Sequence, residues 1–120
     1  MSMNKQLKLV EEFHKKFKQP ILDTPSLAPK DRSDFRYVLM SEEVKEYQEG
    51  VQENDLVKIA DALTDTLYAV YGTILEHGLQ DKMEEIFEEV HASNMSKDYH
   101  EYKLLKGPNY FKANIAKFLN

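Results

Sequence analysis

The fold is decided by residues 55–77, DLVKIADALTDTLYAVYGTILEH, the most apolar helical stretch of the chain. Hydrophobic side chains recur there at intervals of three or four residues, which is the spacing of one helical face. Asp55 or Asn54 can cap the first turn, and Gly78 can end the helix. We expect the buried stripe of this helix to consist of Leu56, Ile59, Ala60, Leu63, Leu67, Val70 and Ile74.

The same periodicity predicts three further helices, over residues 4–18, 30–52 and 80–93. The three prolines between Pro20 and Pro29 predict an ordered loop, and a short last helix is expected over residues 113–119. Strand signals are nearly absent. We therefore predict one all-α domain over residues 1–120, resembling a four-helix bundle, in which the second and third helices form a central hairpin. The expected core residues of the other helices are Leu7, Val10, Phe13 and Phe17, then Phe35, Val38, Leu39, Val44 and Tyr47, then Met83, Ile86, Phe87 and Val90.

Composition excludes several classes of protein. A net charge of −5 argues against a sequence-independent nucleic-acid binder, which needs a basic face. No segment approaches the roughly 20 apolar residues of a membrane span, and the first ten residues lack the apolar run of a signal peptide. Cysteine is absent, which fits the cytoplasm. Small helical proteins often complete their cores by forming oligomers, so a homo-oligomer is expected.

Two clusters of carboxylates carry the chemistry. Glu42, Glu43 and Glu46 share a face of the second helix, and Asp61 and Asp65 lie one turn apart on the third. A solvated helix face explains the glutamates alone, but aspartates inside the most apolar helix gain no stability from that position. Antiparallel packing would bring these oxygens together, an arrangement that suits Mg²⁺, with Mn²⁺ as the alternative. We expect metal-assisted phosphoryl or nucleotidyl chemistry, with Glu42 as the base that activates water.

A basic segment follows the fourth predicted helix. Asn94 and Lys97 share a face and offer donors for a sugar or base and a charge for a phosphate. From about residue 97 onward lysines outnumber acids, so this tail could fold over an anionic substrate at the acidic site. A frayed helix end and a surface tail that merely packs Tyr110 and Phe111 explain the same residues without a ligand.

Four segments in order resemble the all-α nucleoside triphosphate pyrophosphatase superfamily, which includes MazG, phosphoribosyl-ATP pyrophosphohydrolase and dimeric dUTPases. The first is the EExxE pattern at Glu42, Glu43 and Glu46. The other three are residues 59–73 (IADALTDTLYAVYGT), 90–97 (VHASNMSK) and 105–110 (LKGPNY). The last three are similar to MazG-like and phosphoribosyl-ATP pyrophosphohydrolase-like proteins, and the resemblance covers residues 8–112.

The resemblance implies hydrolysis of a nucleotide between its α and β phosphates, with Mg²⁺ held by acids of the second and third helices. It implies that Glu43, Glu46 and Asp65 are metal ligands. It also implies dimers or tetramers with sites near subunit interfaces. Its substrate-binding positions match Asn94, Lys97 and Lys106, and we assign Tyr110 with them.

One position departs from the family pattern ExxD. Ala62 stands where the pattern has glutamate, three residues before Asp65, and we expect Asp61 to replace it as a ligand. In the other register Asp61 is the final acid and Lys58 occupies the glutamate position. This departure leaves a second interpretation open, a non-catalytic helical module that binds a nucleotide or a partner. A phosphoribosyl-ATP pyrophosphohydrolase is the third, and the basic tail favours the MazG-like group over it.

Overall fold

The computed structural model describes residues 5–119 and contains four α-helices over these residues, as the sequence predicts. Their bounds are α1 Lys5–Lys16, α2 Lys30–Gln52, α3 Leu56–Glu76 and α4 Met83–Met95. The chain divides into two compact units, one ending at Gln80 and the other beginning at Asp81. The all-α class is confirmed.

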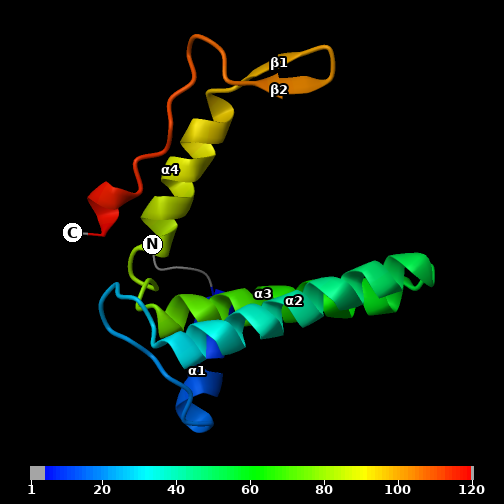
Figure 1. Ribbon diagram of the computed structural model, residues 1–120, viewed down its shortest axis with the longest axis vertical. Coiled ribbons are helices and arrows are strands. Elements are labelled where there is room, and N and C mark those ends of the chain that lie inside the picture. The colour runs from blue at the N-terminus through cyan, green and yellow to red at the C-terminus, as the bar shows by residue number, and fades with distance from the viewer. Residues whose placement is uncertain (1–4, 120) are drawn as a thin grey trace. The chain divides into compact units, whose positions relative to one another are not determined.

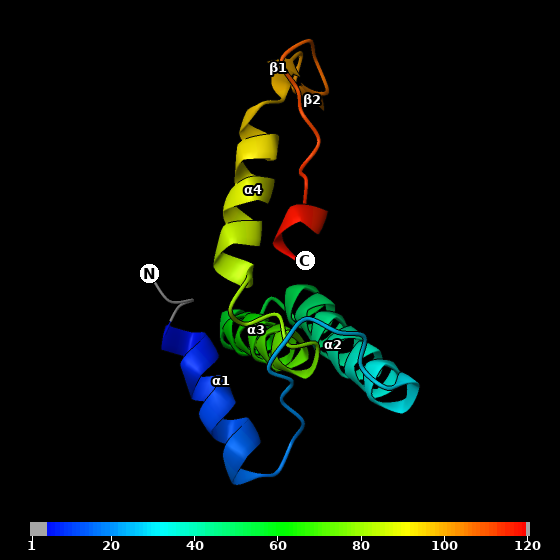
Figure 2. The ribbon, with the colours of Figure 1, turned by 90° about the vertical axis from the view of Figure 1, so that its left-hand side faces the viewer.

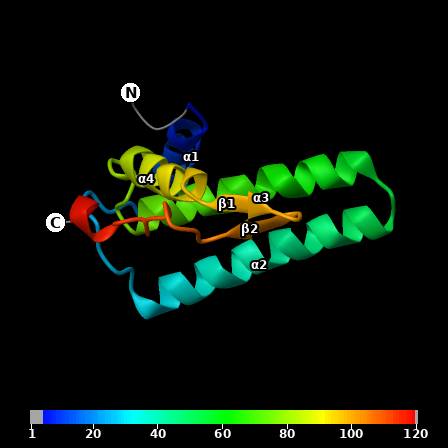
Figure 3. The same cartoon turned by 90° about the horizontal axis from the view of Figure 1, so that it is seen from above.

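The first unit is built on an antiparallel hairpin of α2 and α3, which lie side by side along their lengths (Figures 1 and 3). The turn between them is closed by a bond from the Asp55 backbone N–H to the Gly50 carbonyl, at 3.0 Å. The Asp55 carboxylate accepts from the Lys58 N–H at 3.1 Å, so it caps α3 as predicted. This short turn forces the two helices to pack against each other.

Helix α1 and the loop that follows it pack on the C-terminal half of α3 (Figure 1). The loop is ordered by backbone bonds of 3.0 Å from Leu22 N–H to the Leu75 carbonyl and from Ser26 N–H to the His77 carbonyl. Gly78 ends α3 with a φ of 65°, and a Cβ atom at this position would collide with the Thr24 carbonyl. The predicted loop and the predicted helix stop are therefore both confirmed.

The predicted buried stripe of α3 is largely wrong. Leu63 and Leu67 are 50% and 54% exposed, while Ala62 and Ala69 are 1% and 4% exposed. Each residue turns the helix by about 100°, so the large apolar side chains lie on a different face from these alanines. Helix α2 approaches the face with small residues, because that face permits close packing of two backbones. Most of the large apolar stripe is exposed; Ile74 is buried and Ile59 is partly buried.

The core prediction for the other two helices of this unit has a mixed outcome. In α1, Leu7 and Val10 are buried as predicted, whereas Phe13 and Phe17 are about half exposed. In α2 the buried residues are Arg36 and Gly50, neither of which was predicted. The prediction is wrong for Phe35, Val38, Val44 and Tyr47, which are all exposed. As in α3, the large apolar side chains lie outside the face along which the two helices pack.

The second unit consists of α4, a small hairpin and the C-terminal segment. Strands β1 (Asp98–His100) and β2 (Lys103–Leu105) pair antiparallel, with Asp98 opposite Leu105. The sequence did not predict this hairpin, because three-residue strands show no measurable alternation. The expected last helix is only a 3₁₀ turn, η1, over Ala116–Phe118.

The C-terminal segment runs back along α4 (Figure 2). Ser93 Oγ donates to the Phe111 carbonyl at 2.8 Å, and the Phe111 N–H donates to Ser96 Oγ at 3.1 Å. One turn earlier on α4, Glu89 accepts from the Asn114 N–H at 2.8 Å and pairs with Lys117 at 3.3 Å. These bonds fix the segment to its own helix. Within residues 5–119 there is no helix with the length and hydropathy that a membrane crossing requires.

Candidate metal centre

Three predicted site residues meet between α2 and α3. Glu43 and Glu46, three residues apart on α2, face Asp65 of α3, and one carboxylate oxygen from each lies within 4.8 Å of the other two. Glu43 and Asp65 are partly buried, whereas Glu46 is exposed. The structure thus brings together the acids of the two helices in the way that antiparallel packing predicts.

Glu43 has the least favourable electrostatic environment in this cluster. Its Oε2 atom is buried and has no hydrogen-bond partner. Burial raises the pKa of Glu43, and the neighbouring charges of Glu46, Asp65 and Asp61 raise it further. An ionised carboxylate in this position lacks a compensating positive charge.

The residues present fit a hard divalent cation. Mg²⁺ and Mn²⁺ prefer carboxylate oxygens, and they commonly take only a few protein ligands and leave the remaining positions to water or phosphate. Glu43, Glu46 and Asp65 supply three such donors at one point, and the buried Oε2 atom of Glu43 is a lone-pair donor without a partner. A cation here would satisfy that atom and remove the repulsion.

Two other predicted acids lie outside this group of three. Asp61 is exposed on α3, one turn before Asp65, and acts on Glu43 through its charge. Glu42 is exposed on α2 beside Glu43. Both side chains are therefore accessible to water.

The departure from the ExxD pattern has a clear structural setting. Ala62 is 1% exposed, so the position that carries glutamate in the pattern is filled by a small core side chain. Lys58 is not directed to the cluster, because its ammonium pairs with Glu53 at 2.6 Å and Glu49 at 3.6 Å near the turn. The register that ends at Asp65 is thus the one that the geometry supports.

The predicted substrate-binding residues all belong to the second unit. Asn94 is exposed near the end of α4, and Lys97 lies just beyond it, partly buried. Lys106 is exposed, and its ammonium lies 5.3 Å from the centre of the Tyr110 ring. Lys106 and Tyr110 therefore form a cation–π pair at the base of the hairpin.

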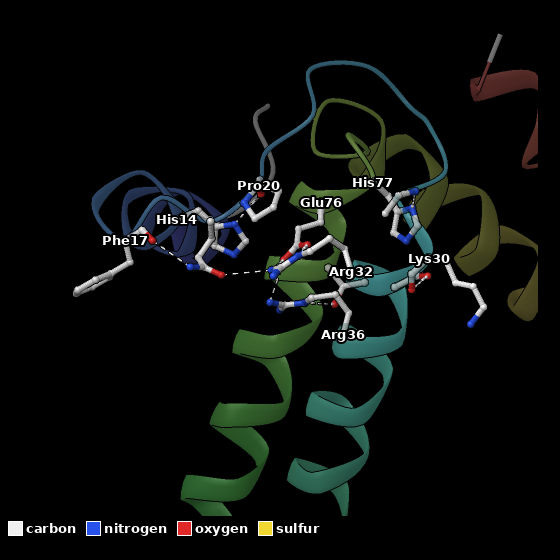
Figure 4. A network of polar contacts seen from close by, with 12 residues as sticks. His14, Phe17, Pro20, Lys30, Arg32, Arg36, Glu76 and His77 are labelled. Atoms are coloured by element: carbon white, nitrogen blue, oxygen red, sulfur yellow. Dashed lines mark hydrogen bonds and ion pairs between the residues drawn. The ribbon is translucent and has the colours of Figure 1, made fainter.

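Sequence reasoning missed a buried polar network in the first unit (Figure 4). Arg32 and Arg36 of α2 both bind the carboxylate of Glu76, which is 1% exposed, at 2.9 and 3.1 Å. His14 of α1 lies beside them, 2% exposed, with its Nδ1 atom 2.9 Å from the Pro20 carbonyl. The available signal was Arg36, a charged residue one heptad before Glu43 on the same helical face.

Comparison with known proteins now identifies the family. No curated protein matches the chain. The sequence profile of the family described as phosphoribosyl-ATP pyrophosphohydrolase matches residues 10–94, well over half of the chain. The match covers the whole of α2 and α3, the second half of α1 and nearly all of α4, and it includes the three clustered acids. The chain therefore belongs to the phosphoribosyl-ATP pyrophosphohydrolase family, a MazG-like family of the all-α nucleoside triphosphate pyrophosphatase superfamily.

Proposed function

We propose that this protein is a Mg²⁺-dependent nucleotide pyrophosphohydrolase, which cleaves a nucleoside triphosphate between its α and β phosphates to give a monophosphate and pyrophosphate. The observation that carries the proposal is the convergence of Glu43, Glu46 and Asp65, with an unpartnered Glu43 oxygen, in a chain of this family. Members of the family are typically metal-dependent.

In the proposed mechanism Glu43, Glu46 and Asp65 hold the cation, and Asp61 supports it from the next turn. The bound Mg²⁺, or Mn²⁺ in its place, would neutralise phosphate charge. Glu42, which is exposed and directly precedes Glu43, accepts the proton of the attacking water as the bond to the leaving pyrophosphate breaks. We assign Glu42, Glu43 and Glu46 to catalysis.

The remaining parts of the proposal concern the second unit, assembly and location. We assign nucleotide contacts to Asn94, Lys97, Lys106 and Tyr110. The exposed apolar residues of α2 and α3 support a homodimer or homotetramer. We place the protein in the cytoplasm, acting on nucleotides rather than on nucleic acids or membranes.

Release of pyrophosphate from a panel of nucleoside triphosphates, with Mg²⁺ and with EDTA, tests the reaction. Wild-type protein should hydrolyse one or a few of them only with the metal. Glu43→Gln and Asp65→Asn should abolish release, whereas Asp34→Asn, an exposed acid elsewhere on α2, should retain it. Unchanged turnover in both cluster variants would rule out this mechanism.

Phosphoribosyl-ATP is a second candidate substrate, favoured by the description of the matching family. Phosphoribosyl-ATP should be included in the same panel, because a cation at the acidic cluster could bind its triphosphate as well as that of a nucleoside triphosphate. Preferential hydrolysis of phosphoribosyl-ATP would reassign the substrate and keep the reaction. Nucleotide binding without any release of pyrophosphate would indicate a non-catalytic module.

A further inference from the structure

Arg36 connects α2 to three successive points on α3. Its Nη2 atom donates to the Ala69 carbonyl at 2.8 Å, and its Nε atom donates to Thr73 Oγ1 at 3.1 Å. Its Nη1 atom pairs with the Glu76 carboxylate at 3.1 Å (Figure 4). The side chain is 7% exposed, so these bonds are shielded from water. The planar guanidinium holds its donors in a fixed fork, so the three acceptors must keep their relative positions.

These contacts lie on the same helical faces as the acidic cluster. On α2, Gly50, Glu43 and Arg36 follow one another at intervals of seven residues. In the packing of α2 against α3, Gly50 faces Ile59, Glu43 faces Asp65 and Arg36 faces Thr73. Six residues separate Ile59 from Asp65, and eight separate Asp65 from Thr73. Both spacings are about two helical turns. Arg36 thus contacts α3 from about one turn beyond Asp65, at Ala69, to about three turns beyond it, at Glu76.

The cluster itself offers no attraction that could hold this register. Its members are like charges, and Glu43 Oε2 has no bond of its own. A slip of one residue would move Asp65 by about 1.5 Å along the helix and about 100° around it. Metal ligands tolerate deviations of only about 0.2 Å. The spacing of the acids must therefore be set by contacts outside the cluster.

We propose that Arg36 is a positioning residue for the acidic centre, which fixes the rotation and axial position of α3 on α2 and thereby sets the distance from Asp65 to Glu43 and Glu46. This inference rests on the proposed function, because it assigns Arg36 a role in holding the cation. Arg36 does not touch the cluster and acts on it only through α3.

Arg32 provides a matched control. It binds the same Glu76 carboxylate, at 2.9 Å, but it makes no bond to Ala69 or Thr73. Its other bond goes to Gln19 in the loop, at 3.3 Å, and its side chain is 27% exposed. Loss of Arg32 should therefore weaken the network around Glu76 without releasing the part of α3 next to Asp65.

The test is Mn²⁺ binding by the full chain, measured by electron paramagnetic resonance, with folding checked by circular dichroism. Arg36→Lys keeps the charge but loses the fork, and it should weaken Mn²⁺ binding roughly ten-fold, as outer-shell changes do. Arg32→Lys should bind like the wild type even if its melting temperature falls similarly. A merely structural role would lower the melting temperatures of both variants and leave both affinities unchanged.

Thr73→Val covers the case in which Arg36→Lys does not fold. It removes only the hydroxyl that accepts from Arg36 Nε and should weaken Mn²⁺ binding by a smaller factor. If Arg36→Lys folds and binds Mn²⁺ as tightly as the wild type, the inference is wrong but the proposed function stands. If Arg36→Lys does not fold, wild-type affinity of Thr73→Val has the same meaning. Absence of Mn²⁺ binding by the wild-type chain overturns the proposed function and the inference together.

Discussion

At the residue scale, Glu43 lowers the stability of the metal-free fold, and the proposed function depends on the same carboxylate. Its carboxylate is partly buried among like charges, and burial and these neighbours both raise its pKa. A raised pKa in the folded state means that ionisation at neutral pH disfavours folding. This repulsion supports the proposal that the cluster binds a cation, because the Glu43 Oε2 atom has no partner within the protein.

Replacing either cluster acid by its amide should therefore leave the metal-free protein as stable or make it more stable. Thermal unfolding of Glu43→Gln and Asp65→Asn in EDTA measures this directly. Addition of Mg²⁺ should raise the melting temperature of the wild type and have little effect on either variant. A large loss of melting temperature in EDTA would instead identify these acids as structural.

His14 makes the first unit sensitive to acid. Burial lowers its pKa below 6.5, and Arg36 lowers it further. The groups that face it are Arg36, Arg32 and Glu76, so protonation would add a third cation around one carboxylate. Because the unfolded chain takes up this proton near pH 6.5 and the folded chain does not, stability should fall as the pH drops below that value.

Melting temperatures between about pH 7 and pH 5 test this dependence. The wild type should lose stability over this range, and His14→Gln should show a flatter profile, whatever its absolute stability. His100→Gln, at an exposed histidine whose side chain is 72% exposed, should behave like the wild type. Parallel profiles for the wild type and His14→Gln would contradict the argument.

At the scale of elements, the end of α3 depends on one backbone conformation. Gly78 has a φ of 65°, which strains any residue with a Cβ atom, and the Thr24 carbonyl leaves no space for one. Gly78→Ala should cost at least about 1–2 kcal/mol in the free energy of unfolding. Asn54→Gly is the control, because Asn54 has a φ of 53° and already carries a Cβ. Urea denaturation should show this control unchanged or more stable.

The elements also show what the sequence can predict. Both bounds of α2 follow from Pro29 and from the turn at residues 53–55, because capping and backbone restriction act locally. The facing of Glu43 and Asp65 was predictable from helical periodicity alone. The choice of buried face was not, because Ala62 and Ala69 allow close approach of α2 while the larger apolar residues do not. Likewise, the Arg36 network depends on Glu76, which is forty residues away in the sequence.

At the scale of the whole molecule, α2 and α3 carry many exposed apolar residues. Leu63, Leu67 and Val70 of α3 are between 36% and 54% exposed and lie on one side of the helix. Contiguous apolar surfaces of this kind mark interfaces in proteins that are otherwise rich in charge. A second copy of the chain is the partner that we propose.

Sedimentation velocity should give a mass that is a multiple of the chain mass of 14.1 kDa. The double variant Leu63→Glu, Leu67→Glu should shift the protein toward the monomer, because it places charges on the apolar stripe. Leu27→Ser, at a loop residue that is 92% exposed, should leave the mass unchanged. A wild-type monomer at micromolar concentration would contradict the proposed assembly.

The way in which α4 holds the C-terminal segment has a consequence for its evolution. Ser93, Ser96 and Glu89 bind main-chain groups of Phe111 and Asn114, and Glu89 also pairs with the side chain of Lys117. Most side chains at these positions would preserve those bonds, whereas proline would remove an N–H donor. The segment can therefore diverge widely in sequence while keeping its path, and new contacts can be selected on its outer side without rebuilding the helix beneath it.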